Sequence, residues 1–103
     1  MSDFEKLVDT LDVLYRRLNT IVTTSEFIFV KIIPSVIEEL KSLGCAYHSL
    51  HYNDKTNTIY IYFSYNDNKS CIGVVLDLHQ IRDSGVRIKA YYYLQGAPCD
   101  FKL

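Results

Sequence analysis

The residues of this chain that could do chemistry are few, and two of them stand close together in its second half. Asp77 and His79 are separated by one residue, so in a strand both side chains would lie on the same face, near His51. A carboxylate beside an imidazole can orient a general base or hold a metal ion. The pattern is generic, because the sequence contains no HExxH, CxxC or glycine-rich phosphate loop. We therefore predict no catalytic residue, no metal site and no cofactor, and keep a small metal- or His/Asp-dependent enzyme as an alternative.

The three cysteines, Cys45, Cys71 and Cys99, are an odd number without the paired spacing of a zinc site or a disulfide framework. Cys45 and His48 would lie on opposite faces of a strand, which excludes a thiolate nucleophile with this histidine as its base. We expect free thiols, two half-buried and one in the C-terminal tail, as in most cytosolic proteins.

Tyrosine is the more informative residue type, with nine copies, all but Tyr15 after Gly44. Strand alternation places many of them on one face of a sheet together with two cations. The candidate partner-binding residues are Tyr47, Tyr60, Tyr62, Arg87, Lys89, Tyr91 and Tyr93.

Two helices must precede this sheet. Residues 3–22 carry apolar side chains at the spacing of one helical face. Residues 24–43 keep a helical stripe through Pro34, which predicts a helix kinked at the proline. The alternative is a buried strand over 26–32 followed by a shorter helix, because Phe27 to Val30 are β-favouring residues. The helical periodicity favours the kinked helix.

After Gly44 the period changes to that of strands, in four β-rich runs separated by turn clusters: 45–52, 58–65, 71–79 and 86–94. The fold class predicted for residues 1–103 is a single α+β domain, with two N-terminal helices on one face of a four-stranded antiparallel meander, order 1-2-3-4. Aligning the apolar positions across simple hairpins puts Cys45 on the outer face and His48 on the core face. The predicted outer rows are His51–Tyr60–Asp77–Arg87, Ser49–Tyr62–Val75–Lys89 and Tyr47–Ser64–Gly73–Tyr91, with Tyr91 leaning across the gap at Gly73.

Charge and hydropathy exclude some function classes. The net charge of -1 is unlike that of a dedicated duplex-DNA binder, which carries a basic surplus. No run of about 20 apolar residues could span a membrane. The acidic N-terminus lacks the basic region of a signal peptide, so we expect a cytoplasmic protein without membrane contact. Frequent Ile, Tyr, Asn and Lys residues have AT-rich codons, typical of many viral or mobile-element genes.

The tyrosine-bearing face is the feature from which a function can be predicted. A solvated sheet face often has this composition. Tyrosine and arginine are also enriched at protein interfaces, which favours a non-enzymatic, homodimeric interaction module that binds a protein partner through this face. Single-stranded nucleic acid, stacked on tyrosines beside Arg87 and Lys89, is the less favoured partner, because the charge is wrong and the glycine-aromatic signature of RNA-recognition motifs is missing.

Overall fold

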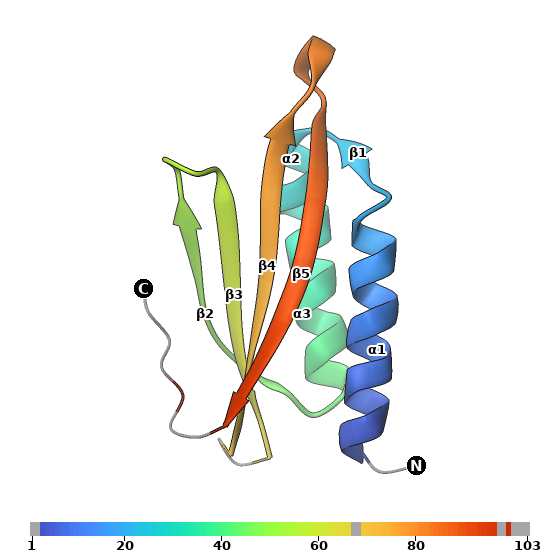
Figure 1. The fold of residues 1–103 in the computed structure, drawn as a ribbon, viewed down its shortest axis with the longest axis vertical. Helices are drawn as coiled ribbons and strands as arrows, with labels where there is room; N and C mark the ends of the chain where they lie inside the picture. Colours follow the sequence, from blue (N-terminus) through green and yellow to red (C-terminus); the bar gives the residue numbers. More distant parts are fainter. Residues whose placement is uncertain (1–2, 67–68, 97–98, 100–103) are drawn as a thin grey trace.

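The computed structural model describes residues 3–66, 69–96 and 99 (Figure 1). Its elements, in chain order, are α1 (Asp3–Leu18), β1 (Val22–Thr23), α2 (Ser25–Phe27), the π-helical turn η1 (Ile28–Ile32), α3 (Ile33–Ser42), β2 (Ala46–Asn53), β3 (Thr58–Tyr65), β4 (Ser70–Gln80), the 3-10 turn η2 (Arg82–Ser84) and β5 (Val86–Gly96). The helices lie on one side of a twisted antiparallel sheet, as the predicted α+β class requires (Figure 1).

The sheet has five strands in the order β1-β5-β4-β3-β2. The four long strands are neighbours in chain order, which confirms the predicted meander, but the predicted count of four is wrong. The fifth strand, β1, pairs with β5 through Val22–Arg87 and Thr23–Val86. The apolar spacing assigned Val22 to the first helix, which ends instead at Leu18. Asn19 leaves the helix to bind β5 through its side chain.

The second helical segment is continuous from Ser25 to Ser42, so the helical interpretation of residues 26–32 is confirmed against the strand. Thr24 caps its start by accepting a hydrogen bond from the Phe27 N–H at 3.1 Å. Pro34 lacks an N–H, and its ring would clash with the carbonyl of Val30 in a regular helix. The wider π-turn of η1 lies directly before this proline and accommodates it.

One hydrophobic core fills the space between the helices and the sheet. α1 contributes a stripe of buried leucines (Leu7, Leu11, Leu14 and Leu18), and the second helical segment contributes Ile28, Ile32, Ile33, Val36 and Leu40. The sheet contributes alternate residues of β3, β4 and β5. These are the apolar positions that strand alternation assigned to the core, so the two faces of β3, β4 and β5 are as predicted.

Candidate binding face

The face of the sheet opposite the helices is the candidate binding surface, named here the tyrosine face. It consists of alternate residues of the four long strands: Ser49, His51, Thr58, Tyr60, Tyr62, Ser64, Cys71, Gly73, Val75, Asp77, His79, Arg87, Lys89, Tyr91 and Tyr93. Within the described part of the chain, no helix or strand lies over it (Figure 1). Six of the seven predicted partner-binding residues lie on this face.

Tyr47 is the exception, because β2 contains a bulge at His48. The register shifts between Tyr47–Phe63 and Ser49–Tyr62, so residues before His48 change face. Tyr47 therefore lies on the helix side, edge-to-face with Phe63 at 5.9 Å between ring centroids. His48 lies on the outer side, 2.8 Å from Ser64 Oγ, and Cys45 is buried in the core. The predicted faces of all three residues are wrong, and no spacing in the sequence signals a bulge.

The rows across β4 also differ from the predicted ones, by two residues. Tyr60 lies opposite Val75, which lies opposite Tyr91, and Tyr62 and Tyr93 flank Gly73. The turns set this register: Lys69 N–H donates to Asn66 C=O across the β3–β4 turn, and Ile81 N–H donates to Gly85 C=O across the β4–β5 loop. A slip of two residues leaves every side chain on its own face, so hydrophobic patterning could not detect it.

The floor of the tyrosine face is buried although no described helix or strand covers it. Val75 is 1% exposed and Tyr62 is 4% exposed. Neighbouring rings contribute to this cover, because Tyr60 stacks on Tyr62 at 6.3 Å with a 10° interplanar angle, and His51 stacks on Tyr60 at 6.2 Å. The aromatic side chains therefore form a packed layer on the sheet rather than separate solvated groups.

Gly73 and Tyr93 form the closest contact in this layer. A Cβ atom on Gly73 would overlap with the Tyr93 ring, so the ring fills the space that the missing side chain leaves. Tyr91, which the sequence predicted for this position, lies opposite Val75 instead. Burial, the charge of Tyr93 and a hydrogen bond with Tyr93 together raise the pKa of Tyr62 to about 12.

The upper surface of the layer is open to solvent. Tyr91 is 43% exposed and Tyr93 is 37% exposed, while Tyr60 is partly exposed. Burial, followed by the negative charge of Asp77, raises the pKa of Tyr91. The neutral phenol is thus the stable form of this exposed hydroxyl, which can both donate and accept a hydrogen bond.

Charged residues gather at the end of the face that lies toward the β4–β5 loop. Asp77 lies opposite Lys89, not Arg87 as predicted, and accepts a hydrogen bond from Thr58 Oγ1 at 2.8 Å. His79 lies opposite Arg87, and both are exposed. Asp77 thus lies across from a lysine and accepts a hydrogen bond from the Thr58 hydroxyl. Among residues 3–66, 69–96 and 99, no three His, Cys, Asp or Glu side chains lie close enough to hold a metal ion.

A disulfide closes the opposite end of the tyrosine face. Cys71 of β4 is bonded to Cys99, with their Cα atoms 5.5 Å apart, so the chain returns to β4 after β5 ends. The prediction of free thiols is wrong for these two cysteines, because nothing in the spacing shows that β5 brings Cys99 back to Cys71. Cys45 is free and buried, and burial raises the pKa of its thiol to about 11, which makes it a poor nucleophile.

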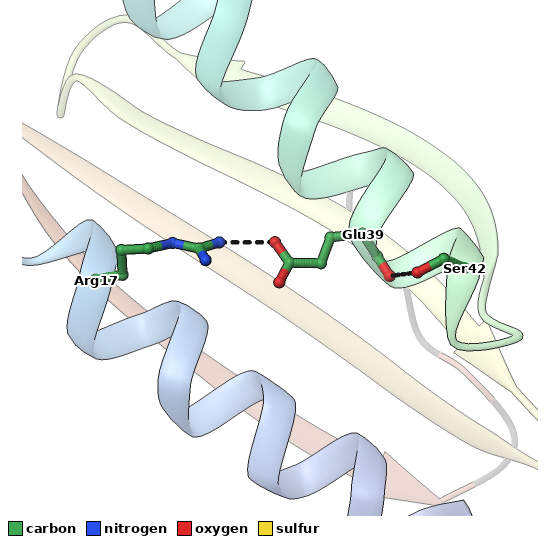
Figure 2. Close-up of polar contacts among 3 residues, drawn as sticks. All are labelled: Arg17, Glu39 and Ser42. Atoms are coloured by element: carbon green, nitrogen blue, oxygen red, sulfur yellow. Dashed lines mark hydrogen bonds and ion pairs between the residues drawn. The ribbon is translucent and has the colours of Figure 1, made fainter.

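A cleft lies on the helix side of the molecule, between α1 and the second helical segment. This cleft has a volume of about 430 Å³ and an apolar floor that includes Leu14 and Val36. Two of its charged lining residues bind each other, since Arg17 Nη2 lies 2.7 Å from Glu39 Oε2, and Ser42 Oγ donates to the Glu39 carbonyl (Figure 2). The ion pair joins the two helices at the surface, and Lys31 is the third charged residue that lines the cleft.

Comparison of the chain with known protein families, curated proteins and solved structures gives no match. None of the described helices is long and apolar enough to span a membrane. The functional argument therefore depends on the geometry of the tyrosine face alone.

Proposed function

We propose that this protein is a non-enzymatic interaction module whose tyrosine face binds a protein partner. One observation carries the proposal: exposed tyrosine rings rest on a buried floor, on a sheet face that no described element covers. The binding residues are Tyr60, Tyr91 and Tyr93, with Tyr62 as their support and Arg87 and Lys89 at the charged end.

The rings are suited to binding because neighbouring side chains already hold them. Tyr93 is fixed over Gly73, and Tyr60 is fixed by stacking on Tyr62 and His51. A side chain that is ordered before binding loses little conformational entropy when a partner covers it. Tyrosine also offers a large apolar contact area and a hydroxyl for hydrogen bonding, which explains its frequency at interface hot spots.

The charges define the chemistry of the partner. The exposed cations Arg87 and Lys89 lie on one side of the aromatic layer. A complementary surface presents apolar or aromatic side chains to Tyr91 and Tyr93 and a carboxylate to Lys89. Such pairing fixes orientation and partner choice more than it adds affinity.

Location and origin stay predictions from the sequence. The disulfide Cys71–Cys99 argues against the predicted cytoplasmic location, because structural disulfides are rare where glutathione keeps thiols reduced. The prediction of a viral or mobile-element origin depends on the frequency of amino acids whose codons are AT-rich. Homodimer formation is likewise a prediction from the sequence.

The test is selection from a displayed peptide library against the full-length protein, with a Tyr91→Ser/Tyr93→Ser double variant as the matched negative. We expect enriched peptides that bind the wild type, contain acidic residues, and bind at least tenfold more weakly to the double variant and to Lys89→Glu. A Val13→Ser variant, changed at an exposed position of α1, serves as the control and should bind like the wild type.

Two outcomes contradict the proposal. Peptides that bind the double variant as well as the wild type would place the interaction elsewhere. If a mixed-sequence single-stranded oligonucleotide quenches tyrosine fluorescence, with an affinity that falls as salt rises, the face binds nucleic acid instead.

A further inference from the structure

The two edges of the sheet differ in how their backbone groups are satisfied. In an antiparallel ladder, the N–H and C=O groups of alternate residues point to opposite sides of a strand. Any strand at an edge therefore presents unpaired groups that can accept another strand. The direction of these groups on β2 and β5 can be derived from the hydrogen bonds of the structure.

On β5, the outward groups are largely occupied. The Ala90 N–H donates to Asn19 Oδ1 at 2.9 Å, and Asn19 Nδ2 donates to the Ala90 carbonyl at 2.9 Å. One side-chain amide thus replaces a strand neighbour. The Ile88 N–H donates to the Ile21 carbonyl at 3.3 Å, and β1 pairs with the start of the strand. Among the described residues, no partner is seen for the outward backbone groups from Tyr92 to the end of β5.

On β2, the outward groups are those of Leu50 and Tyr52. The Leu78 N–H donates to the Asn57 carbonyl at 2.9 Å. The backbone N–H and C=O groups of odd-numbered residues from Asn57 through β3 therefore point toward β4. Even-numbered β3 residues then point toward β2, where they meet Ser49, His51 and Asn53. The backbone N–H and C=O groups of Leu50 and Tyr52 point away from β3 at the edge of the sheet, and no described residue pairs with them.

The edge of β2 also lacks the usual protection against pairing. Natural edge strands carry charged side chains, prolines or bulges that prevent another strand from docking. From Ser49 to Asn53 the edge has no Lys, Arg, Asp, Glu or Pro. The bulge at His48 lies at one end and the turn at Asp54 at the other, so the regular segment is centred on His51.

We propose that a second copy of this chain pairs with this edge, β2 against β2, around a two-fold axis at His51. Leu50 of one copy then faces Tyr52 of the other, and each pair exchanges two N–H to C=O hydrogen bonds. His51 of each copy meets its counterpart at the non-hydrogen-bonded position, where the side chains approach most closely. A strand edge is self-complementary in this arrangement, and an uncharged one meets no like-charge repulsion.

Exposed aromatic side chains beside the β2 edge support a second copy of the chain as the partner of this edge. On the helix side, Tyr52 is 40% exposed and Phe29 is 39% exposed, with their rings edge-to-face at 5.6 Å. Pairing places Leu50 of the other copy against Tyr52 and covers this exposed apolar surface. The two five-stranded sheets become one continuous sheet with both tyrosine faces on the same side. The dimer therefore doubles the proposed binding surface, although the pairing itself does not depend on that function.

The introduction of a charge at His51 tests the proposal on the full-length chain. Sedimentation equilibrium of the wild type should show a particle of twice the 12.0 kDa chain mass. His51→Lys and His51→Glu should each be monomeric, with a dissociation constant raised roughly a hundredfold, because like charges meet at the axis. An equimolar mixture of the two variants should recover the dimer, since opposite charges then meet.

His79→Lys is the matched control, with the same substitution on the same face but away from the edge, and it should remain dimeric. Thermal unfolding of each variant separates lost pairing from lost folding, and recovery in the mixture shows that both folds are intact. A monomeric wild type, a dimer that persists in both His51 variants, or a mixture that stays monomeric would overturn the proposal. The binding residues Tyr91 and Tyr93 are unchanged in these variants, so failure here is distinguishable from failure of the proposed function.

Discussion

The two faces of the sheet bury their side chains by different means. On the helix face, aliphatic residues of β3, β4 and β5 are covered by α1 and the second helical segment, which is the usual construction of a core. On the tyrosine face, Val75 and Tyr62 reach similar burial although no described helix or strand lies over them, and the Tyr60 ring stacks on Tyr62. Large flat side chains can thus build a shallow second core on a sheet surface, and its upper side stays available for a partner.

Each face also contains a tyrosine with a pKa of about 12, for different reasons. Tyr92, on the helix face, donates a hydrogen bond to Asp12 of α1, and this bond is the main cause of its raised pKa. For Tyr62, on the tyrosine face, burial is the main cause. The main contribution on the helix face is therefore a polar contact between two elements, whereas on the tyrosine face it is the burial of the ring.

The largest expected effect concerns the disulfide, which joins Cys99 to the tyrosine face at Cys71. The bond closes a loop with a sequence separation of 28 residues, and its removal should lower the free energy of unfolding by about 3–4 kcal/mol. Urea unfolding of Cys99→Ser measures this loss. A reductant should destabilise the wild type to the same level and leave the variant unchanged. If the wild type resists the reductant, the disulfide does not stabilise the fold.

The next effect compares the two faces directly through neighbouring residues of β4. Val74 is buried on the helix face and Val75 on the tyrosine face. Replacing either by alanine removes two buried methyl groups, and each change should cost about 2 kcal/mol. Urea unfolding of the two variants gives both values. A cost below about 0.5 kcal/mol for Val75→Ala, as at a surface position, would mean that the rings over it are not packed.

The parts of this fold that could be predicted are those that periodicity determines. Alternation placed the side chains of β3, β4 and β5 on the correct faces, and the helical stripe was sufficient to identify a helical segment that continues through Pro34. The assignments that failed depend on single local events. The bulge at His48 moved Tyr47 to the helix side, and side-chain bonds of Asn19 ended the first helix early.

The register and the disulfide could not be predicted for a related reason. A shift of two residues preserves both faces, so only the turns at Asn66–Lys69 and Ile81–Gly85 decide which residues meet across β4. Cys99 returns to Cys71 because β5 ends at Gly96, beside the start of β4. Such pairings depend on where the strands end in space, which cannot be read from the spacing of residues along the chain.

A smaller effect tests the contact between Gly73 and Tyr93. In Gly73→Ala the new Cβ would displace the Tyr93 ring, and the expected cost is about 1 kcal/mol, because the end of a side chain can move more easily than backbone. Near-ultraviolet circular dichroism should show the loss of ordered tyrosine. Gly96→Ala is the matched control, since its Cβ would meet no atom within 4 Å. Equal spectra for the two variants would show that Tyr93 is not held over Gly73.

The last prediction has no effect at neutral pH and compares Tyr62 with Tyr92 in alkaline solution. Both pKa values rise from 10.0 in the unfolded chain to about 12 in the folded protein, so the neutral phenols contribute stability that is fully present below pH 10. The folded state binds more protons than the unfolded state between pH 10 and 12, and the free energy of unfolding therefore falls as pH rises through this range. Tyr62→Phe and Tyr92→Phe should each make this fall less steep, and each should remove one late step from the tyrosinate absorbance titration. The Tyr92 variant is the reference, because helices cover its face. If only Tyr92→Phe removes a late step, water reaches Tyr62 freely, and the tyrosine face is a solvated surface rather than a second core.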